Sequence, residues 1–348
     1  SVPHQPDDKI AKVTLSDRGV FVNFLKAALP EEVGEVLFLD AEHVAPVPPD
    51  FITDDLKHFE PDLLFKIAFR PEFAAAGEVA AGAYVLLHFE SQRREQPHFS
   101  CRLMGYKSLG ITKHLSQNPK ARTLPLMLTV VLAQGKKPWR QPARFGAEMY
   151  GLGGEVARRL ARFAPTFDYV LFDLGGHSLA DLSGAAFASL DPTVRALLLL
   201  LRAKAEGGDA LASDYVLDES LLRRVGVEHL RRFAYYILTT AGVDKERVIA
   251  KLNSFKDRKT KETTMTVADQ LRAEGRAEGR AEGRAEGVAV GKTEGKREGI
   301  LAGVVRTAQM LLGMKPLPKR ALLSKTREEL QAMFEALCAR EPRLARVL

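Results

Sequence analysis

Cysteine, tryptophan and long apolar runs are scarce in this chain. Its 348 residues include 2 cysteines and 1 tryptophan, and Cys101 and Cys338 lie too far apart for a disulfide framework or a zinc ribbon. So few cysteines are typical of a reducing compartment. The longest aliphatic run, residues 196–201, is far shorter than the roughly 18 to 20 residues that a membrane span needs. The sequence therefore argues against a disulfide-stapled domain and a membrane-spanning helix.

The composition is otherwise that of a large globular protein. Hydrophobic residues make up 46% of the chain, which is enough for a sizeable core, and 348 residues exceed one typical domain. Residues 1–5 lack the basic and apolar parts of a signal peptide, so we expect a cytoplasmic protein without a membrane partner. The net charge of +7 fits a partner made of phosphates, although many basic proteins never bind nucleic acid.

Apolar periodicity predicts a mixed body in the first half of the chain. The predicted strands are residues 63–69, 83–89, 125–132 and 169–174, and the predicted helices are residues 8–13, 20–28 and 99–115. Three prolines between residues 36 and 50 indicate an extended connection there. The order helix, strand, strand, helix, strand predicts an α/β fold with a mixed sheet flanked by helices.

Helical patterns dominate after residue 193, at residues 194–205, 217–225, 229–241 and 245–255. Residues 256–261 are polar and basic, and we expect a linker there. We accordingly divide the chain into a core at residues 1–190, a helical region at 191–260, a glycine-punctuated segment at 261–299 and C-terminal helices at 300–348.

The glycine-punctuated segment contains the tetrapeptide Arg-Ala-Glu-Gly, repeated over residues 272–287. A glycine at every fourth position costs about 1 kcal/mol each in a lone helix, while small residues would let two such helices approach closely. Each repeat pairs one arginine with one glutamate, so the array alone cannot hold DNA strongly. A flexible linker and a self-association helix are equally good interpretations, and we expect a homodimer.

Carboxylates border two of the predicted strands. Asp62 opens the strand at 63–69, and Glu90 closes its hairpin partner, so antiparallel pairing would bring both to one sheet end. Two carboxylates and the carbonyl of Ser91 are oxygen ligands of the kind that Mg²⁺ prefers. Gln92, two residues beyond Glu90, would share its face and could orient a water. From spacing alone, ordinary polar residues at strand ends are the simpler interpretation.

Four separated motifs resemble the recombination-promoting nuclease family, also called transposase-like or YhgA-like, within the PD-(D/E)xK nuclease superfamily. The motifs are Pro61-Asp62-Leu63-Leu64-Phe65, His88-Phe89-Glu90-Ser91-Gln92, Arg102-Leu103-Met104-Gly105-Tyr106, and residues 124–126 through Gln134-Gly135-Lys136-Lys137-Pro138-Trp139. The resemblance implies a restriction-endonuclease-like fold with a helical C-terminal region. It also implies a DNA endonuclease linked to recombination or to mobile-element and defence biology.

The resemblance places catalysis on Asp62, Glu90 and Gln92, with Asp62, Glu90 and Ser91 as ligands of Mg²⁺ or another divalent cation such as Mn²⁺ or Ca²⁺. Gln92 stands where the superfamily usually has lysine. The family commonly begins with His-Asp-x-x-Phe-Lys. Here only Asp8 and Lys12 match that pattern, and they are candidate accessory residues.

Basic residues near these motifs are candidates for binding the DNA backbone, namely Arg93, Arg94, Lys136 and Lys137. We interpret His88 as a core or supporting residue, with a ligand role as the alternative. A rival function is a catalytically inactive DNA-binding or assembly protein that keeps the nuclease fold. The missing lysine and the altered first motif keep this rival open beside the nuclease interpretation, and metal binding would separate the two.

Overall fold

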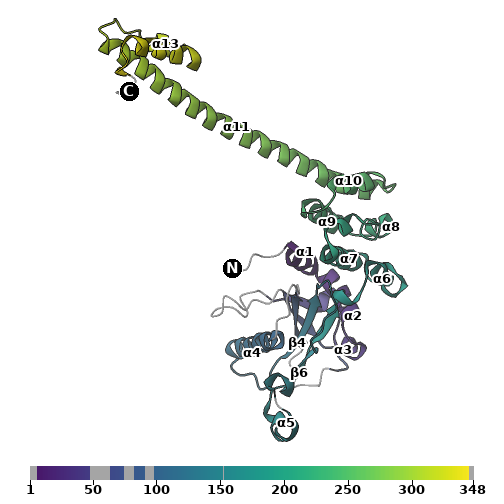
Figure 1. Ribbon diagram of the computed structural model, residues 1–348. Helices are drawn as coiled ribbons and strands as arrows, with labels where there is room; N and C mark the ends of the chain where they lie inside the picture. Colours follow the sequence, from purple (N-terminus) through teal and green to yellow (C-terminus); the bar gives the residue numbers. More distant parts are fainter. Residues whose placement is uncertain (1–5, 48–62, 74–81, 91–97, 152, 345–348) are drawn as a thin grey trace. The chain divides into compact units, whose positions relative to one another are not determined.

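The computed structural model describes residues 6–47, 63–73, 82–90, 98–151 and 153–344, with only the backbone of Pro6, Asp7, Gly82, Phe89, Glu90, Ala147 and Glu148. The chain forms two compact units, Ser1–Asp269 and Gln270–Leu348. The first unit contains a five-stranded mixed sheet with helices on both faces (Figure 1). The expected α/β class with a helical C-terminal region is therefore confirmed.

The sheet has the strand order β1-β2-β3-β4-β7. Its strands are β1 (Val44–Pro46), β2 (Leu63–Ala68), β3 (Gly82–Glu90), β4 (Leu126–Ala133) and β7 (Val170–Asp173). β1, β2 and β3 pair antiparallel, whereas β3, β4 and β7 pair parallel. The apolar runs that predicted four of these strands are buried in the central part of the sheet, as is typical of strands covered on both faces.

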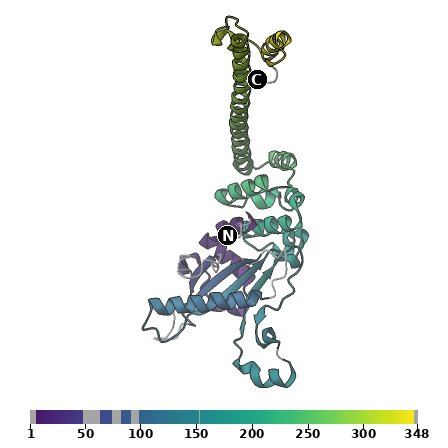
Figure 2. The ribbon, with the colours of Figure 1, turned by 60° about the vertical axis from the view of Figure 1, so that its left-hand side comes forward.

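Helix α4 (Phe99–Gln117) covers one face of the sheet and connects the parallel strands β3 and β4 (Figure 2). It packs through Phe99, Leu103 and Tyr106, which are all buried. The cluster that they form with the sheet also contains Leu64, Tyr84, Leu86, Met127, Val131 and Tyr169. Tyr106 is therefore a core residue of this interface.

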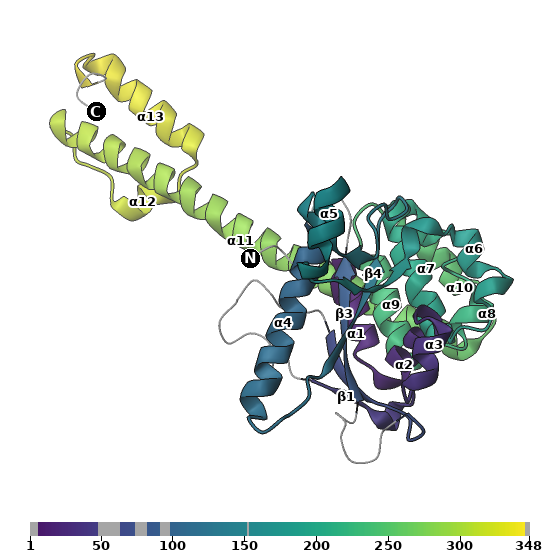
Figure 3. The same ribbon diagram turned by 90° about the horizontal axis from the view of Figure 1, so that it is seen from below.

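The opposite face is covered by α1 (Pro6–Leu15), α2 (Arg18–Ala28) and α7 (Pro192–Glu206) (Figure 3). Phe21 of α2 stacks on Phe65 with ring centroids 3.9 Å apart, and Phe24 meets Phe172 of β7 at 5.6 Å. Carboxylates set the starts of two of these helices. Asp17 caps α2 and Asp191 caps α7 by accepting backbone N–H bonds.

The remaining elements of the first unit are short or peripheral. They are α3 (Glu31–Val36), β5 (Arg144–Phe145), α5 (Gly154–Leu160), β6 (Phe167–Asp168), α6 (Leu179–Ser183), α8 (Glu219–Leu222), α9 (Val227–Thr239) and α10 (Lys245–Asn253). β5 and β6 form a separate two-stranded sheet. Each of the four helical patterns predicted after residue 193 corresponds to one helix, from α7 to α10.

The long helix α11 (Arg258–Leu311) corrects the expectation of a linker at residues 256–261. The Asp257 carboxylate accepts a hydrogen bond from the backbone N–H of Thr260 at 2.8 Å. This cap begins the helix within the polar, basic stretch. Buried side chains follow at helical spacing, at Thr260, Thr263, Thr264, Val267 and Ala268. The repeat continues the same helix, so within the structure it is neither a loop nor a break.

In the second unit, the end of α11 packs against α12 (Lys319–Leu323) and α13 (Arg327–Arg340) around a small apolar core. Its buried residues are Ala302, Val305, Ala308, Leu322, Leu330, Leu337 and Leu344. Between residues 272 and 297 every side chain of α11 is exposed. The helix is thus anchored by apolar contacts only near its ends.

Lys107 of α4 is a cation within an apolar interface. Its ammonium group donates a hydrogen bond to the carbonyl of Met127 and lies 4.9 Å from the centre of the Phe167 ring. Burial lowers the pKa of Lys107 from 10.5 to about 8, because a charged amine loses hydration there. The folded protein therefore binds this proton less tightly than the unfolded chain does.

We predict that Lys107 makes the free energy of unfolding rise between about pH 8 and 10.5, because the unfolded chain holds more protons in that window. Below pH 8 the penalty is fully present. Lys107→Met should remove this slope and raise stability near neutral pH by on the order of 1–3 kcal/mol. Urea unfolding at several pH values measures both effects, with the exposed Lys66→Met as control. An unchanged slope in Lys107→Met would contradict the assignment.

Candidate functional site

The carboxyl ends of three parallel strands meet at one edge of the sheet. Glu90 of β3 pairs with Ala133 of β4, and Ala133 pairs with Asp173 of β7. With strands about 4.8 Å apart, the backbones of Glu90 and Asp173 lie roughly 10 Å from each other across this edge. Gln134 directly follows Ala133. We call this edge, defined by Glu90, Ala133 and Asp173, the carboxyl edge; in open α/β sheets such edges commonly hold ligands.

The residues expected to carry catalysis fall only partly within the described chain. Asp62, Ser91, Gln92, Arg93 and Arg94 lie outside the described residues, and Glu90 is described only by its backbone at the end of β3. The meeting of the two carboxylates around one cation therefore stays a prediction.

The backbone next to these residues has a defined register. Leu63, bonded to Asp62, pairs with Leu87, three residues before Glu90. The antiparallel hairpin expected from the sequence is thus present. β2 therefore begins three residues before the level at which β3 ends.

His88 and Arg102 form a polar pair beneath this end of β3. His88 is 7% exposed and lies between the rings of Phe99 and Tyr106, with centroids 5.7 Å and 5.8 Å away. The Arg102 Nη2 atom lies 3.1 Å from His88 Nε2. Since a guanidinium only donates, Nε2 accepts and carries no proton. The supporting role expected for His88 fits this contact.

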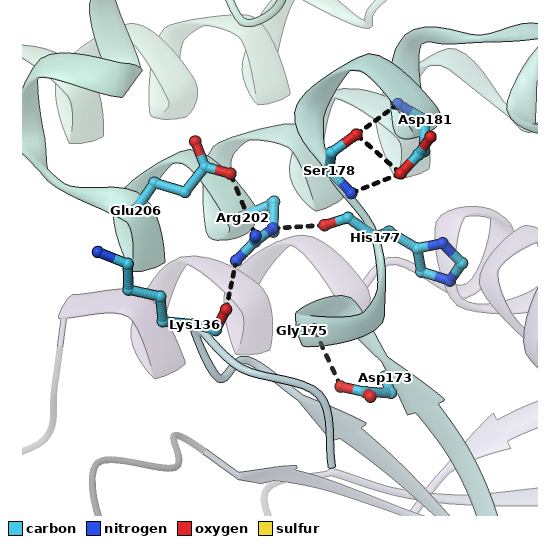
Figure 4. A network of polar contacts seen from close by, with 8 residues as sticks. All are labelled: Lys136, Asp173, Gly175, His177, Ser178, Asp181, Arg202 and Glu206. Carbon is cyan, nitrogen blue, oxygen red and sulfur yellow. Dashed lines mark hydrogen bonds and ion pairs between the residues drawn. The ribbon is translucent and has the colours of Figure 1, made fainter.

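Asp173 ties two loops together at the other side of the edge, and Figure 4 shows its contact with Gly175. One carboxylate oxygen accepts the backbone N–H of Gly175 at 2.9 Å, and the other accepts that of Trp139 at 2.8 Å. Both oxygens are therefore engaged with backbone donors. Asp173 is a structural carboxylate that holds the chain after β4 against the chain after β7.

Arg202 of α7 completes this network from the helical layer (Figure 4). Its guanidinium is buried and donates from Nε to the carbonyl of His177 at 2.5 Å and from Nη1 to that of Lys136 at 3.2 Å. Its Nη2 atom pairs with Glu206 at 3.1 Å. Two carbonyls and one carboxylate thus satisfy the buried guanidinium, because a buried charge is costly without such partners.

Lys136 and Lys137 follow β4 at the carboxyl edge, and both side chains are exposed. Within the described ranges, neither lysine forms an ion pair. Trp139 ends the stretch as an anchor for the fold, because its ring meets the Phe99 ring edge-on at 5.1 Å. The structure therefore brings two of the four expected DNA-binding residues to the edge where β3 ends at Glu90.

Gln134 is a polar residue to which the sequence assigned no separate role. It is 6% exposed, and neither its amide nitrogen nor its amide oxygen has a hydrogen-bond partner in the described part of the chain. Buried polar groups are normally satisfied. The only sequence signal was Gln134-Gly135 directly after an apolar strand, which marks the strand's end without indicating burial.

Asp8 and Lys12 lie on α1, which packs against α7 and α9. Their accessory role stays a prediction. Across the described ranges, no three histidine, cysteine, aspartate or glutamate side chains converge as metal ligands would. The helices of the described chain also include none long and apolar enough to span a membrane.

Comparison with known proteins points to one family. The profile of the family described as "Putative transposase, YhgA-like" matches residues 5–210. A curated relative, "Recombination-promoting nuclease RpnD" of Escherichia coli O157:H7, is 25% identical over 137 residues, which are 38% of this chain and 48% of the relative. The match thus spans about half of that relative's length. No solved structure is significantly similar to the chain. Because the family profile covers more than half of its residues, this chain belongs to the YhgA-like transposase family.

Proposed function

We propose that the protein is a metal-dependent DNA endonuclease with a PD-(D/E)xK-type site at the carboxyl edge. The observation that carries the proposal is the register of the sheet. It ends β3 at Glu90 beside the chain that bears Lys136 and Lys137, while β2 begins one residue after Asp62. A carboxylate-bearing edge next to two exposed cations suits a phosphodiester substrate. Membership of a family with a relative named as a nuclease supports this chemistry.

The donor set proposed for this edge fits a hard cation. Asp62, Glu90, the Ser91 carbonyl and the unsatisfied Gln134 amide oxygen are all oxygen donors, which Mg²⁺ prefers. When bound, such a cation would polarise the phosphoryl group and lower the pKa of a water. Gln92 would orient that water through its amide, and Lys136 and Lys137 would hold phosphates of the strand being cut.

The first test concerns the two carboxylates. Asp62→Ala and Glu90→Ala should each reduce cleavage on the order of a hundredfold or more, because each removes a ligand of the cation. Plasmid nicking with magnesium, stopped by a chelator, measures this. The control is Glu72→Ala, which removes an exposed carboxylate from the turn after β2.

Near-normal nicking by both carboxylate variants would remove this site. DNA binding without any metal-dependent nicking by the wild-type protein would instead favour the rival function, an inactive DNA-binding or assembly protein.

The second test concerns Gln134. Gln134→Leu removes a buried amide that has no described partner, so the folded state should lose little or gain slightly. If the amide serves the site, cleavage should fall about tenfold or more, the effect of removing about 1.4 kcal/mol or more of transition-state stabilisation. Thr129→Val is the matched control, because Thr129 lies on β4, the strand that Gln134 follows, and its buried hydroxyl also has no described partner. Equal cleavage by both variants would assign Gln134 to structure alone.

We further propose that residues 272–299 of α11 pair two copies of the chain. At about 100° per residue, the repeat places arginine on one flank of the glycine stripe, glutamate on the other and alanine opposite. Two such helices can be related by a two-fold axis that runs parallel to them, with their glycine stripes in contact. On each flank, the arginines of one helix then lie opposite the glutamates of the other. An antiparallel pair would set like charges together, so the charge pattern favours a parallel dimer.

The length of this contact is limited by geometry. A four-residue repeat drifts about 40° per repeat relative to 3.6 residues per turn, so straight helices share the glycine stripe over only a few repeats. Rows at i±4 spacing pack with helices crossing near −50°. A pair of crossing helices would bring two copies of the nuclease together. Cutting both strands of DNA favours two active sites, and a two-fold dimer is the commonest way to supply them.

The third test separates pairing from chemistry. Removing residues 270–348 keeps the first compact unit whole and should abolish the dimer in light scattering while leaving DNA nicking. In the full chain, replacing the four repeat glutamates by arginine should also abolish the dimer, because like charges then face each other; they are Glu274, Glu278, Glu282 and Glu286. Exchanging arginine and glutamate within every repeat keeps complementarity and should keep the dimer. One oligomeric state for all variants would contradict this role.

A further inference from the structure

The six residues Gln134–Trp139 after β4 form a segment that we call the edge loop. Lys136 and Trp139 join the network above through backbone atoms, and the loop's two lysines stand exposed at the carboxyl edge. The rest of the fold contacts the backbone of the loop rather than its charged side chains. The backbone that carries the two lysines is therefore fixed, while their ammonium groups form no described ion pairs.

Three separate contacts fix the edge loop. Arg202 donates to the Lys136 carbonyl at 3.2 Å, and Asp173 accepts the Trp139 N–H at 2.8 Å. The third contact is steric, because a Cβ atom added at Gly175 would overlap the Lys137 carbonyl. Figure 4 shows the Lys136 carbonyl turned toward Arg202.

These contacts come from distant parts of the sequence. Arg202 is 66 residues from Lys136, and Asp173 is 34 residues from Trp139. A loop held from both α7 and the end of β7 has few alternative conformations. Binding to a rigid loop loses less conformational entropy than binding to a mobile one, so such a loop is suited to presenting its cations in one geometry.

We propose that Arg202, Asp173 and Gly175 are positioning residues that preform the edge loop as a binding site for a phosphate of the DNA backbone. The two lysines act as point charges on that phosphate, and contacts of this kind fix register without reading sequence. The inference rests on the proposed nuclease function for its substrate. It adds the residues that present the cations, none of which touches DNA itself.

The test uses Gly175→Ala in the full-length protein, with the neighbouring Gly176→Ala as matched control. At Gly176 the nearest atom to an added Cβ is an Asp173 oxygen at 3.4 Å, an ordinary contact. Binding of a labelled duplex is measured by fluorescence anisotropy at several salt concentrations with a chelator present, so that cleavage does not contribute. We expect Gly175→Ala to weaken affinity about tenfold and to lower the salt slope by about 1. Gly176→Ala should bind like the wild type.

A second background separates positioning from general damage. In a Lys136→Gln, Lys137→Gln protein, Gly175→Ala should cause no further loss, because the charges that it displaces are gone. Equal losses in both backgrounds would overturn the inference. Arg202→Lys provides an independent variant should Gly175→Ala fold poorly. It keeps the charge but not the forked donors, and it should show the same dependence on the two lysines.

The remaining outcomes distinguish this inference from the proposed function. Wild-type binding and nicking together with unaltered binding by the double-lysine variant would overturn the role of the edge loop and leave the nuclease proposal intact. A wild-type protein that neither binds duplex DNA nor nicks it would overturn both.

Discussion

Parallel pairing of β3, β4 and β7 is the constraint on which the candidate site depends. Parallel neighbours cannot be joined by a tight turn, so the chain must return along the sheet before the second strand begins. Helix α4 makes this return. Its 19 residues give about 28 Å at 1.5 Å per residue, close to the roughly 30 Å of the nine-residue strand β3. The crossover places the ends of β3, β4 and β7 at one edge, and it lays Arg102 beneath β3 beside His88. Antiparallel pairing of β3 with β4 would have sent the edge loop to the other end of the sheet.

The buried polar groups at this edge differ in whether they have hydrogen-bond partners. This difference distinguishes the residues that support the loops from the candidate functional residue. Arg202 reaches two carbonyls and one carboxylate, and Asp173 accepts two backbone N–H groups. Such groups stabilise one arrangement of the loops, because losing a partner leaves a buried donor or acceptor unpaired at a cost of about 1–3 kcal/mol. Gln134 has no partner in the described chain. An unsatisfied amide beside a satisfied network is what a site prepared for an external polar group would contain.

The sequence predicted the parts of the fold that rest on local patterns. Apolar runs located β2, β3, β4 and β7, and helical spacing located α4 and the helices from α7 to α10. The three-residue strand β1 was not predicted because it ends in Pro46, two further prolines follow it, and its partner lies about 20 residues away. The candidate acids came from motif resemblance. Lys136 and Lys137 were named from charge, but their setting depends on Arg202, Asp173 and Gly175, whose contacts span 34 to 66 residues and leave no local pattern. Burial of Gln134 was invisible for the same reason.

The glycine-punctuated helix shows how an unfavourable local sequence can still be helical. Eight glycines recur at every fourth position from Gly275 to Gly303, and at about 1 kcal/mol each they oppose the helix by roughly 8 kcal/mol relative to alanine. Helix propagation is easier than nucleation. Buried contacts at residues 260–268 and 302–308 supply the nuclei from both ends, and alanine, arginine and glutamate favour propagation. The exposed middle is then the part of α11 that opens most readily. A second helix that packs on the glycine stripe would oppose this opening, so helix formation and pairing would stabilise each other there.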